Sequence, residues 1–561
     1  MLVNHKDLNF LLYDVFDAKG LTQYSHYREH DQSTFDGVID TATHIAQTYF
    51  APHNSKADEH EPQFDGETVS TIPEVKEAWQ HYAKAGLLNA SQSFEDGGMQ
   101  LPTMIHSACS GLFTSANPGT AGYMFLTTAA ANVIHAFGNE DQKNRFLPGM
   151  YSGRFAGTMA LTEPDVGSSL GDLSTKAIPQ SDGSYNLKGQ KMFISGGDQD
   201  ITENIVHLVL ARVEGAVEGV KGISLFITPK YLVDENGESG ARNDVKLVGL
   251  LHKMGYRGTT STVLNFGEDD HCTAYLIGEE GKGLSYMFKM MNEARIGVGL
   301  GAAMIRYRGY LESLEYAKNR PQGRKPSQKE KDSKPVNIIE HADVKRMLLA
   351  QKSYTEGSLA LCLFASRLVD ESEAGDSLKE QERQDSGILL DLLTPVVKSF
   401  PSYYGVKAND LAIQVLAGSG YIREYPVEQC YRDNRLNPIH EGTHGIQSLD
   451  LLGRKLWMNN GKGLKLLMAR VQSTLKNCQA HDALTPLVAS YQQKINIFAQ
   501  TTLLLGQNLQ VGKVDETLAN SALYLDMMGK IVVAWLWLEM ADKAIRTFSS
   551  SESEDDQSFL A

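Results

Sequence analysis

The chain has few cysteines, and none of them are paired at a metal-binding or redox spacing. Its 561 residues include five scattered cysteines, and no C-x-x-C occurs. This argues against a disulfide framework and favours a reducing compartment, for which we expect the cytoplasm. The N-terminal stretch MLVNHKDLNFLLYDVFDAKG carries early acidic residues and no small-residue cleavage site, so we expect no signal peptide.

Long apolar runs and an excess of positive charge are also missing. The longest apolar run, Ile531–Leu538, is too short to cross a bilayer, so no transmembrane segment is expected. The formal net charge of −15 argues against nucleic acid and anionic membrane as partners. Gly297-x-Gly299-x-Gly301 follows no predicted strand, so it is not a dinucleotide-binding fingerprint, and its small residues predict close helix packing.

What is present is a helical chain interrupted by a β domain. The length suggests several domains, and the 42% hydrophobic content is ordinary for globular proteins. Helical spacing of apolar residues dominates residues 1–155, and a period near two follows over residues 156–280. Helical periodicity returns as a bundle at 281–456 and continues through an extension at 457–561. The predicted fold class is α+β and mainly helical.

Periodicity also predicts individual elements. The expected strands are Tyr185–Ile194, Ile205–Val213, Gly222–Ile227, Val245–Leu250 and Thr260–Phe266. The expected long helices include Tyr286–Ala317, 338–370 and Leu389–Gly418. Two acidic segments are predicted to lack structure: a loop at Asp370–Ser386 and a disordered tail from Ser549 onward.

The stretch Asn434–Arg454 carries the densest set of candidate functional residues. A loop containing Pro438 leads to Glu441, and a helical pattern follows. Thr443 is a good N-cap, because its hydroxyl can accept a hydrogen bond from the first backbone N–H groups of the helix. Glu441 therefore lies on a connection just before a helix, where catalytic residues are often found.

Three interpretations of Glu441 are open from these residues alone. His440-Glu441-x-x-His444 matches the H-E-x-x-H pattern of zinc hydrolases, in which two histidines one helical turn apart bind the metal. That pattern requires a continuous helix, whereas Pro438 and Gly442 predict a helix start. The second interpretation is a lone catalytic carboxylate beside a cofactor. The third is an exposed glutamate in a capping loop, as in a non-enzymatic helical scaffold.

The same stretch resembles the catalytic segment of the acyl-CoA dehydrogenase superfamily, E-G-T-x-x-I-Q. The matching residues are Glu441, Gly442, Thr443, Ile446 and Gln447. Further landmarks of that family follow in its order between about residues 70 and 456. They are the segments Gly97–Pro102, Gly138–Pro148, Met159–Ser168, Gly189–Ser195, His252–Thr259, Met290–Gly297, Arg320–Arg324 and Gln414–Asp433.

Two of these landmarks resemble flavin-contacting segments. Met159–Ser168 resembles a segment that usually ends T-E-P-x-x-G-S-D, with Ser169 in place of the aspartate. Backbone N–H groups and hydroxyls in a turn after a strand can stabilise charge on a reduced flavin, although Pro164 is equally typical of a plain type I turn. Gly189–Ser195 resembles G-x-K-x-[WF]-I-[ST], in which Phe193 lies against the flavin; taken alone, Phe193 is equally typical of a strand core.

The resemblance implies FAD as the cofactor and assigns residues to it. The implied FAD-binding residues are Met159, Leu161, Thr162, Ser168, Phe193, Ile194, Ser195, Arg320, Gln414, Leu416, Gly418 and Thr443. In the family, the arginine matched by Arg320 reaches the cofactor pyrophosphate across a subunit boundary, a sound pairing of guanidinium with phosphate. The implied substrate-binding residues are Ser168, Asn292, Arg295 and Gly442, and no metal site is implied.

The resemblance also implies an activity. Glu441 would remove the α-proton of an acyl-CoA thioester, and the β-hydride would pass to flavin N5 to give a trans-2-enoyl-CoA. An electron-transfer flavoprotein would then accept the electrons, as in fatty acid β-oxidation. Burial by the acyl chain would raise the basicity of Glu441, whereas the helix N-terminus favours its ionised form.

The segment wording and the terminal extensions resemble a long-form subgroup that includes 3-methylmercaptopropionyl-CoA dehydrogenases. Within the C-terminal extension, Trp535 and Trp537 point to well-separated faces of one predicted helix, so this helix should be covered on most sides. The extension either packs on its own chain or covers the surface that shorter family members use to form tetramers. On the second ground a homodimer is expected.

Overall fold

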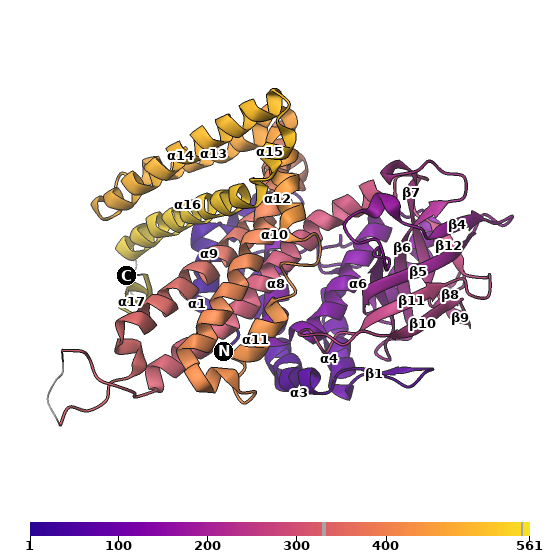
Figure 1. Ribbon diagram of the computed structural model, residues 1–561, viewed down its shortest axis with the longest axis horizontal. Helices are drawn as coiled ribbons and strands as arrows, with labels where there is room; N and C mark the ends of the chain where they lie inside the picture. The colour runs from indigo at the N-terminus through magenta and orange to yellow at the C-terminus, as the bar shows by residue number, and fades with distance from the viewer. Residues whose placement is uncertain (328–331, 551–553, 561) are drawn as a thin grey trace. The chain divides into compact units, whose positions relative to one another are not determined.

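A computed structural model describes residues 1–327, 332–550 and 554–560, the side chains of 288–292, 550 and 554–556 excepted. The chain forms two compact units, each of which draws on separate stretches of the sequence (Figure 1). The first unit contains Met1–Ile39, Pro102–Ser115 and Arg295–Ala561. The second contains Asp40–Leu101 and Ala116–Ala294.

The second unit is built around an eight-stranded sheet. The strand order is β10-β11-β5-β12-β7-β6-β3, and β4 pairs with both β5 and β6. The strands are β3 (Phe155–Ala160), β4 (Lys176–Pro179), β5 (Tyr185–Ser195), β6 (Asn204–Val213), β7 (Ile223–Pro229), β10 (Val245–Leu250), β11 (Ser261–Phe266) and β12 (Thr273–Leu276). The five predicted strands are confirmed to within two residues at either end. Three strands of this sheet were not predicted. Strands β4 and β12 have four residues each, which carry too little periodicity, and β3 shows no alternation because nearly all its residues are buried.

Strand β6 shows why this part of the sequence reads as a nearly continuous apolar run. Its side chains are buried on both faces of the sheet, as is typical of a strand covered from both sides. Leu208 and Leu210 join the cluster formed with α6 (Pro118–Phe137) and α7 (Glu140–Tyr151), whereas Val209 and Ala211 join a second cluster with β5 and β11. Smaller elements complete this unit: α3 (Asn54–Glu59), α4 (Pro73–Lys84), β1 (Gln63–Phe64), β2 (Val69–Ser70), β8 (Tyr231–Val233) and β9 (Ser239–Arg242).

The first unit is a bundle of helices. The long antiparallel pair α9 (Ala342–Ser372) and α10 (Glu380–Leu416) packs side by side, and α16 (Ser521–Ser550) packs on α9, α10, α12 and α13 (Figure 1). The other helices that the argument uses are α8 (Gly283–Asn319), which belongs to this unit from Arg295 onward, and α11 (Val427–Asn434), α12 (His444–Gly453) and α13 (Met458–Cys478). The remaining ones are α1 (His5–Asn9), α2 (Gln32–Ile45), α5 (Thr103–Ala116), α14 (Thr485–Gln510), α15 (Val514–Leu518) and α17 (Glu554–Leu560).

Helices α8 and α10 touch backbone to backbone at one point, where the sequence predicts close packing. A Cβ added at Gly299 of α8 would lie 2.1 Å from the carbonyl oxygen of Val397 on α10. Pro401 lacks the N–H that would otherwise bond this carbonyl within the helix, so the oxygen is available at the contact. The close helix packing predicted for Gly297-x-Gly299-x-Gly301 is thus confirmed at its central residue.

The two acidic segments are more helical than predicted. Helix α9 runs to Ser372 and α10 begins at Glu380, so the predicted loop Asp370–Ser386 shrinks to a short connection. Glu382 completes a capping box with Lys379, and Gln384 donates to Glu380 one turn away, so polar residues stabilise the new first turn. The predicted disordered tail is also wrong where it is described, since α17 covers Glu554–Leu560 and Phe559 meets Phe10 at 6.1 Å between ring centroids.

Helix α16 is covered on more than one side by its own chain. Trp535 donates to Thr474 of α13, and Trp537 donates to the carbonyl of Ser353 on α9. Among the described residues, Ser521–Ser549 is long and apolar enough to cross a membrane, but 61% of its most apolar window is buried. This is weak evidence for a membrane span, because the core helix of a folded domain passes the same test.

All five cysteines are unpaired and buried in the structure: Cys109, Cys272, Cys362, Cys430 and Cys478. Burial raises the pKa of every one of these thiols, so they remain protonated near neutral pH.

Candidate functional site

Glu441 lies on an unusual backbone conformation. Its φ is 52° and that of Gly442 is 86°, so two successive residues occupy the left-handed region. A non-glycine residue there is held by its surroundings at some cost in energy, and such residues cluster at functional sites. Glycine suits the second position, because a φ of 86° strains any residue with a side chain, and a Cβ there would displace Nε2 of Gln447, which would lie 2.6 Å away. That same Nε2 donates to the carbonyl of Glu441 at 3.0 Å.

Thr443 ends the left-handed segment and starts α12. Its hydroxyl accepts a hydrogen bond from the N–H of Ile446 at 3.3 Å, so the predicted N-cap is confirmed. Because α12 begins at His444, His440 and His444 do not lie one turn apart on a helix. The helical geometry that an H-E-x-x-H zinc site requires is therefore absent. Among the described residues, no group of three or more histidine, cysteine or acidic side chains could hold a metal.

The two histidines beside Glu441 are packed as neutral groups. Burial, with a smaller contribution from Lys398, lowers the pKa of His440 to about 3, and its Nε2 meets Oδ1 of Asn437 at 3.1 Å. Burial likewise lowers the pKa of His444, whose ring stacks on Tyr403 at 5.1 Å between centroids. Neither ring is protonated at neutral pH, so Glu441 has no imidazolium beside it.

Two cations face the Glu441 carboxyl. Burial raises its pKa above the ordinary value, while Arg295 of α8 and Lys398 of α10 lower it. Arg295 is buried and donates to Oδ2 of Asp450 on α12 at 3.1 Å, whereas its Nε has no partner within the described structure. Lys398 is completely buried and donates from Nζ to the carbonyl of Gly442 at 2.7 Å. A carboxyl with raised proton affinity, held among cations, is the arrangement that a general base needs.

In the second unit, a buried ion pair fixes the turn after β3. Glu163 is 3% exposed and meets Nζ of Lys191 on β5 at 3.0 Å, and Lys191 also donates to the carbonyl of Leu161. The Glu163 carboxylate accepts four further hydrogen bonds from the backbone and hydroxyls of Ser174 and Thr175. Burial alone would raise the pKa of Glu163, but Lys191 and these donors lower it to about 2.

Around this pair, the residues implied to contact a flavin stay partly accessible. Met159, Leu161 and Thr162 are half-buried and Ser168 is exposed. The carbonyl of Thr162 accepts a hydrogen bond from Met192 N–H on β5, which ties the turn to the neighbouring landmark.

Phe193 is presented to solvent from a strained position in a strand. Its φ is 61° and its side chain is 63% exposed, so the interpretation as a strand-core residue is wrong. The cause is a β-bulge: Lys191 pairs with Leu264 and Ile194 with Thr262, so two residues of β5 oppose one of β11. Such strained residues cluster at functional sites, and the exposed aromatic face can stack on a planar heterocycle.

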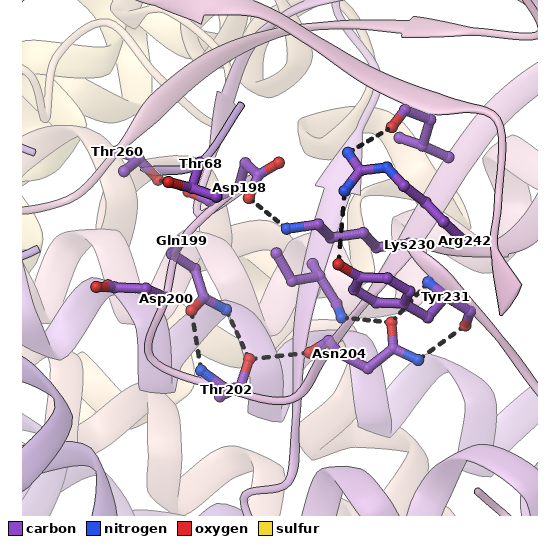
Figure 2. A network of polar contacts seen from close by, with 12 residues as sticks. Thr68, Asp198, Gln199, Asp200, Thr202, Asn204, Lys230, Tyr231, Arg242 and Thr260 are labelled. Atoms are coloured by element: carbon purple, nitrogen blue, oxygen red, sulfur yellow. Dashed lines mark hydrogen bonds and ion pairs between the residues drawn. The ribbon is translucent and has the colours of Figure 1, made fainter. Parts of the chain in front are cut away.

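The loop after this strand is held by a polar network (Figure 2). Asp198 pairs with Lys230 at 2.6 Å, and its carbonyl accepts from the hydroxyl of Thr260. Gln199 closes the loop by accepting from the N–H and donating to the hydroxyl of Thr202. Figure 2 shows Lys230 reaching Asp198 of this loop and Gln199 meeting Thr202 within it, so the chain that follows β5 is held in place.

The remaining implied residues occupy different environments. Arg320, Gln414, Gly418 and Thr443 are exposed, and Ser195 is half-buried. Ile194 and Leu416 are buried in separate hydrophobic clusters, so contact with a cofactor could involve only their backbones. The side chain of Asn292 lies outside the described residues.

Sequence reasoning missed four charged residues that organise these sites: Glu163, Lys191, Lys398 and Asp450. Glu163 and Lys191 lie within two of the landmark segments, as the glutamate of T-E-P and the lysine of G-x-K, but the sequence assigned no role to either. Lys398 had a detectable signal, because it lies in the apolar run TPVVKSF at a position whose neighbours are buried. A lysine is rarely fully buried unless it has a partner.

Four family models match the chain in consecutive blocks. They are the N-terminal, middle and C-terminal domains of acyl-CoA dehydrogenase, at residues 34–154, 158–268 and 281–456, and the acetyl-CoA dehydrogenase C-terminal-like model, at 467–561.

Curated relatives match over most of the chain. A 3-methylmercaptopropionyl-CoA dehydrogenase of Ruegeria pomeroyi is 40% identical over 404 residues, covering 72% of this chain and 67% of the relative. A broad-specificity linear acyl-CoA dehydrogenase, FadE5 of Mycobacterium tuberculosis, is 32% identical over 568 residues, covering 99% and 92% respectively.

Solved structures with low identity share the fold. ACDH-11 of Caenorhabditis elegans, in complex with C11-CoA, matches with a TM-score of 0.77 at 21% identity and covers 98% of this chain and 90% of its own. An acyl-CoA dehydrogenase of Bacillus anthracis complexed with FAD matches with a TM-score of 0.74 at 22% identity, covering 96% and 86%. The extension after residue 456 is therefore part of a fold that other proteins also possess.

Proposed function

The chain belongs to the acyl-CoA dehydrogenase family, and from that premise we propose that it is an FAD-dependent enzyme that oxidises acyl-CoA thioesters to trans-2-enoyl-CoA. The observation that carries the proposal is Glu441: a carboxyl whose burial raises its pKa, on left-handed backbone, facing Arg295 and Lys398. The zinc-hydrolase alternative is not supported, because α12 begins at His444 and His440 lies outside it.

The chemistry requires removal of a weakly acidic proton. The carbon next to a thioester carbonyl loses a proton readily only when a positioned base accepts it and charge on the carbonyl oxygen is stabilised. Glu441 accepts this proton in the proposal. Closure of the site by the acyl chain excludes water and raises the proton affinity of the carboxyl further. Arg295 and Lys398 act against this burial and favour the ionised carboxyl that the reaction requires.

FAD, when bound, supplies the acceptor for the hydride that leaves the β-carbon. The residues we propose to hold it in the second unit are Met159, Leu161, Thr162, Ser168, Phe193 and Ser195, with the backbone of Ile194. In the first unit we propose Arg320, Gln414, Gly418 and Thr443, with the backbone of Leu416. Ser168, Asn292, Arg295 and Gly442 are proposed to contact the acyl-CoA. The exposed ring of Phe193 supports this fit, because a planar heterocycle would cover an otherwise solvated aromatic side chain.

The purified protein tests the proposal directly. We expect a yellow protein whose visible flavin band bleaches under anaerobic conditions when acyl-CoA esters are added. A panel of straight, branched and sulfur-containing esters ranks the substrates by bleaching rate. An electron-transfer flavoprotein is the acceptor we propose, and its reduction in the same cuvette after addition is the second readout. A colourless protein with stoichiometric zinc would contradict the proposal.

Phe193→Ala and Phe193→Gly should both bind FAD about tenfold more weakly, because each removes the aromatic face that we propose to cover the flavin. The two variants should differ in stability. Glycine accepts a φ of 61° without strain, so the apo form of Phe193→Gly should be about 1 kcal/mol more stable than that of Phe193→Ala. FAD titration and urea unfolding measure the two effects.

Phe94→Ala is the matched control for flavin binding, since Phe94 is an aromatic residue of the same unit that is 49% exposed. Its FAD affinity should equal that of the unaltered protein. Unchanged affinity in both Phe193 variants would remove this residue from the proposed site.

We also propose a homodimer, in which the C-terminal extension covers the surface used for tetramers by shorter family members. Multi-angle light scattering of the intact protein should give a mass of twice 61.8 kDa. A tetrameric mass would contradict the idea that the extension blocks further assembly. Leu503 and Leu523, on α14 and α16, are 64% and 73% exposed, and a charge at either position should leave the dimer intact if the extension faces away from the contact.

A further inference from the structure

Lys398 combines three properties that rarely occur together. Its side chain is completely buried, it lies in an apolar part of α10, and its described hydrogen bond goes to a backbone carbonyl rather than to a carboxylate. A buried ammonium without a bonded counter-ion is costly, because the lost hydration is repaid only in part. Burial accordingly lowers the pKa of Lys398 to about 7, so the ammonium is the main form below that pH. A well-packed apolar side chain would be cheaper there if packing were the sole requirement.

The acceptor of that hydrogen bond is the carbonyl of Gly442, at 2.7 Å. Gly442 follows Glu441, and both residues have positive φ. The segment is held on its other side by Gln447, which donates to the carbonyl of Glu441 at 3.0 Å. The two successive carbonyls of Glu441 and Gly442 are therefore each fixed by one buried donor. Loss of either donor frees one end of a backbone segment that is strained by itself.

The position of Lys398 is itself rigid. The neighbouring carbonyl of Val397 lies against Gly299 of α8, with no space for a side chain between the two helices. Pro395 and Pro401 restrict the backbone of α10 on either side. An ammonium placed on such a support can hold a catalytic segment in one geometry.

Several charged and titratable groups face this ammonium. Glu441 attracts it and Arg295 of α8 repels it, while His440 and His444 are neutral rings that it affects. Asp450 of α12 neutralises Arg295, and Asp526 of α16 acts on His444 rather than on Lys398. The Glu441 carboxyl is thus the acidic group that couples to Lys398 itself.

We propose that Lys398 is a positioning residue for the reaction: its ammonium fixes the Gly442 carbonyl and thereby holds Glu441 in its left-handed conformation. This role rests on the proposed function of Glu441 as the base. It adds a residue from a different helix to the catalytic segment.

Lys398→Met tests the inference, because methionine fills similar space but has neither charge nor donor. We expect the limiting rate of anaerobic flavin reduction to fall about 10- to 100-fold. The acyl-CoA concentration that gives half of this rate should be nearly unchanged. The acidic limb of the rate–pH profile should move up by about one pH unit, since a cation that lowers the pKa of Glu441 is gone. Lys398→Arg retains the charge and the donors, so it should return the acidic limb towards its original position.

Lys455→Met is the matched control. Lys455 is a second buried lysine of the same unit, but it pairs with Asp391 at 2.6 Å. Its loss should lower stability and leave the rate–pH profile unchanged. Flavin content and the unfolding midpoint are measured for all three variants.

Two results would overturn the inference. One is a wild-type rate of flavin reduction with an unshifted rate–pH profile in Lys398→Met. The other is a loss of rate in Lys398→Met that is fully explained by loss of flavin or of folded protein, which is the pattern expected for Lys455→Met. The proposed function is tested separately. An active Glu441→Gln variant would exclude Glu441 as the base. An inactive Glu441→Gln variant together with a fully active Lys398→Met variant would exclude only the positioning role of Lys398.

Discussion

Glu441→Gln should abolish substrate-dependent bleaching of the flavin while the protein stays yellow. Glutamine has the size and the hydrogen-bonding capacity of glutamate, but its amide cannot accept the α-proton. A general base typically contributes about 10²- to 10⁴-fold to rate, so the reduction rate should fall by that factor. Stopped-flow absorbance after anaerobic mixing with acyl-CoA measures it.

The structure offers a control for this prediction. Glu441 is half-buried, its carbonyl is held by Gln447 and that of Gly442 by Lys398, so the substitution leaves the left-handed segment in place. Glu516 is an exposed residue of α15 in the same unit and lies outside every landmark segment, so Glu516→Gln should bleach at the normal rate. Bleaching of Glu441→Gln at nearly the original rate would exclude Glu441 as the base.

Lys191→Met should destabilise the second unit strongly. It leaves the Glu163 carboxylate buried without its cation, and breaking a buried pair from one side costs about 3–5 kcal/mol. Glu163→Leu should cost a similar amount, because the donors of Ser174 and Thr175 lose their acceptor. The double variant should lose less than the two single variants together, since neither charge is then left alone. Urea unfolding followed by tryptophan fluorescence gives the three free energies.

The matched control is on the same strand. Lys188 pairs with Asp270 at 2.8 Å, but the two side chains are 56% and 68% exposed. Lys188→Met should therefore cost less than about 1 kcal/mol. Equal losses in Lys188→Met and Lys191→Met would contradict the special role of the buried pair.

Acid should weaken the same contact. The pKa of Glu163 is lowered from 4.5 to about 2 in the folded protein, so its stabilising contribution is fully present above the unfolded value. That contribution is lost as pH falls from about 4.5 towards 2. Stability measured down this range should drop more steeply in the unaltered protein than in the Glu163→Leu, Lys191→Met double variant, which has no carboxyl there to protonate.

Long periodic elements could be predicted from the sequence. The strand at Tyr185–Ile194 ends one residue short of the observed β5, and the helix at Tyr286–Ala317 lies within α8. Local chemistry sufficed there, because periodicity accumulates over many residues. The acidic segment before Leu389 was wrongly assigned to a loop. Its helix depends on a cap and side-chain pairs between polar residues, which no apolar pattern reveals.

The candidate site could be predicted only in part. Glu441 and the T-E-P turn were found by resemblance, and Thr443 by its capping chemistry. Lys398 could not be assigned, because its role depends on α10 passing beside the loop before α12, and that contact joins residues far apart in the chain. The left-handed backbone of Phe193 arises from a bulge against β11, and a single strand carries no sign of it.

The burial of every native thiol makes the chain suitable for selective labelling. Cys109, Cys362 and Cys430 each have a pKa raised to about 12 by burial, so almost no thiolate is available to a maleimide at neutral pH. A cysteine introduced at Val217, which is 63% exposed in the second unit, would react alone. The same holds for one at Leu503 in the first unit. Fluorophores or spin labels can thus be attached to either unit with the native cysteines retained.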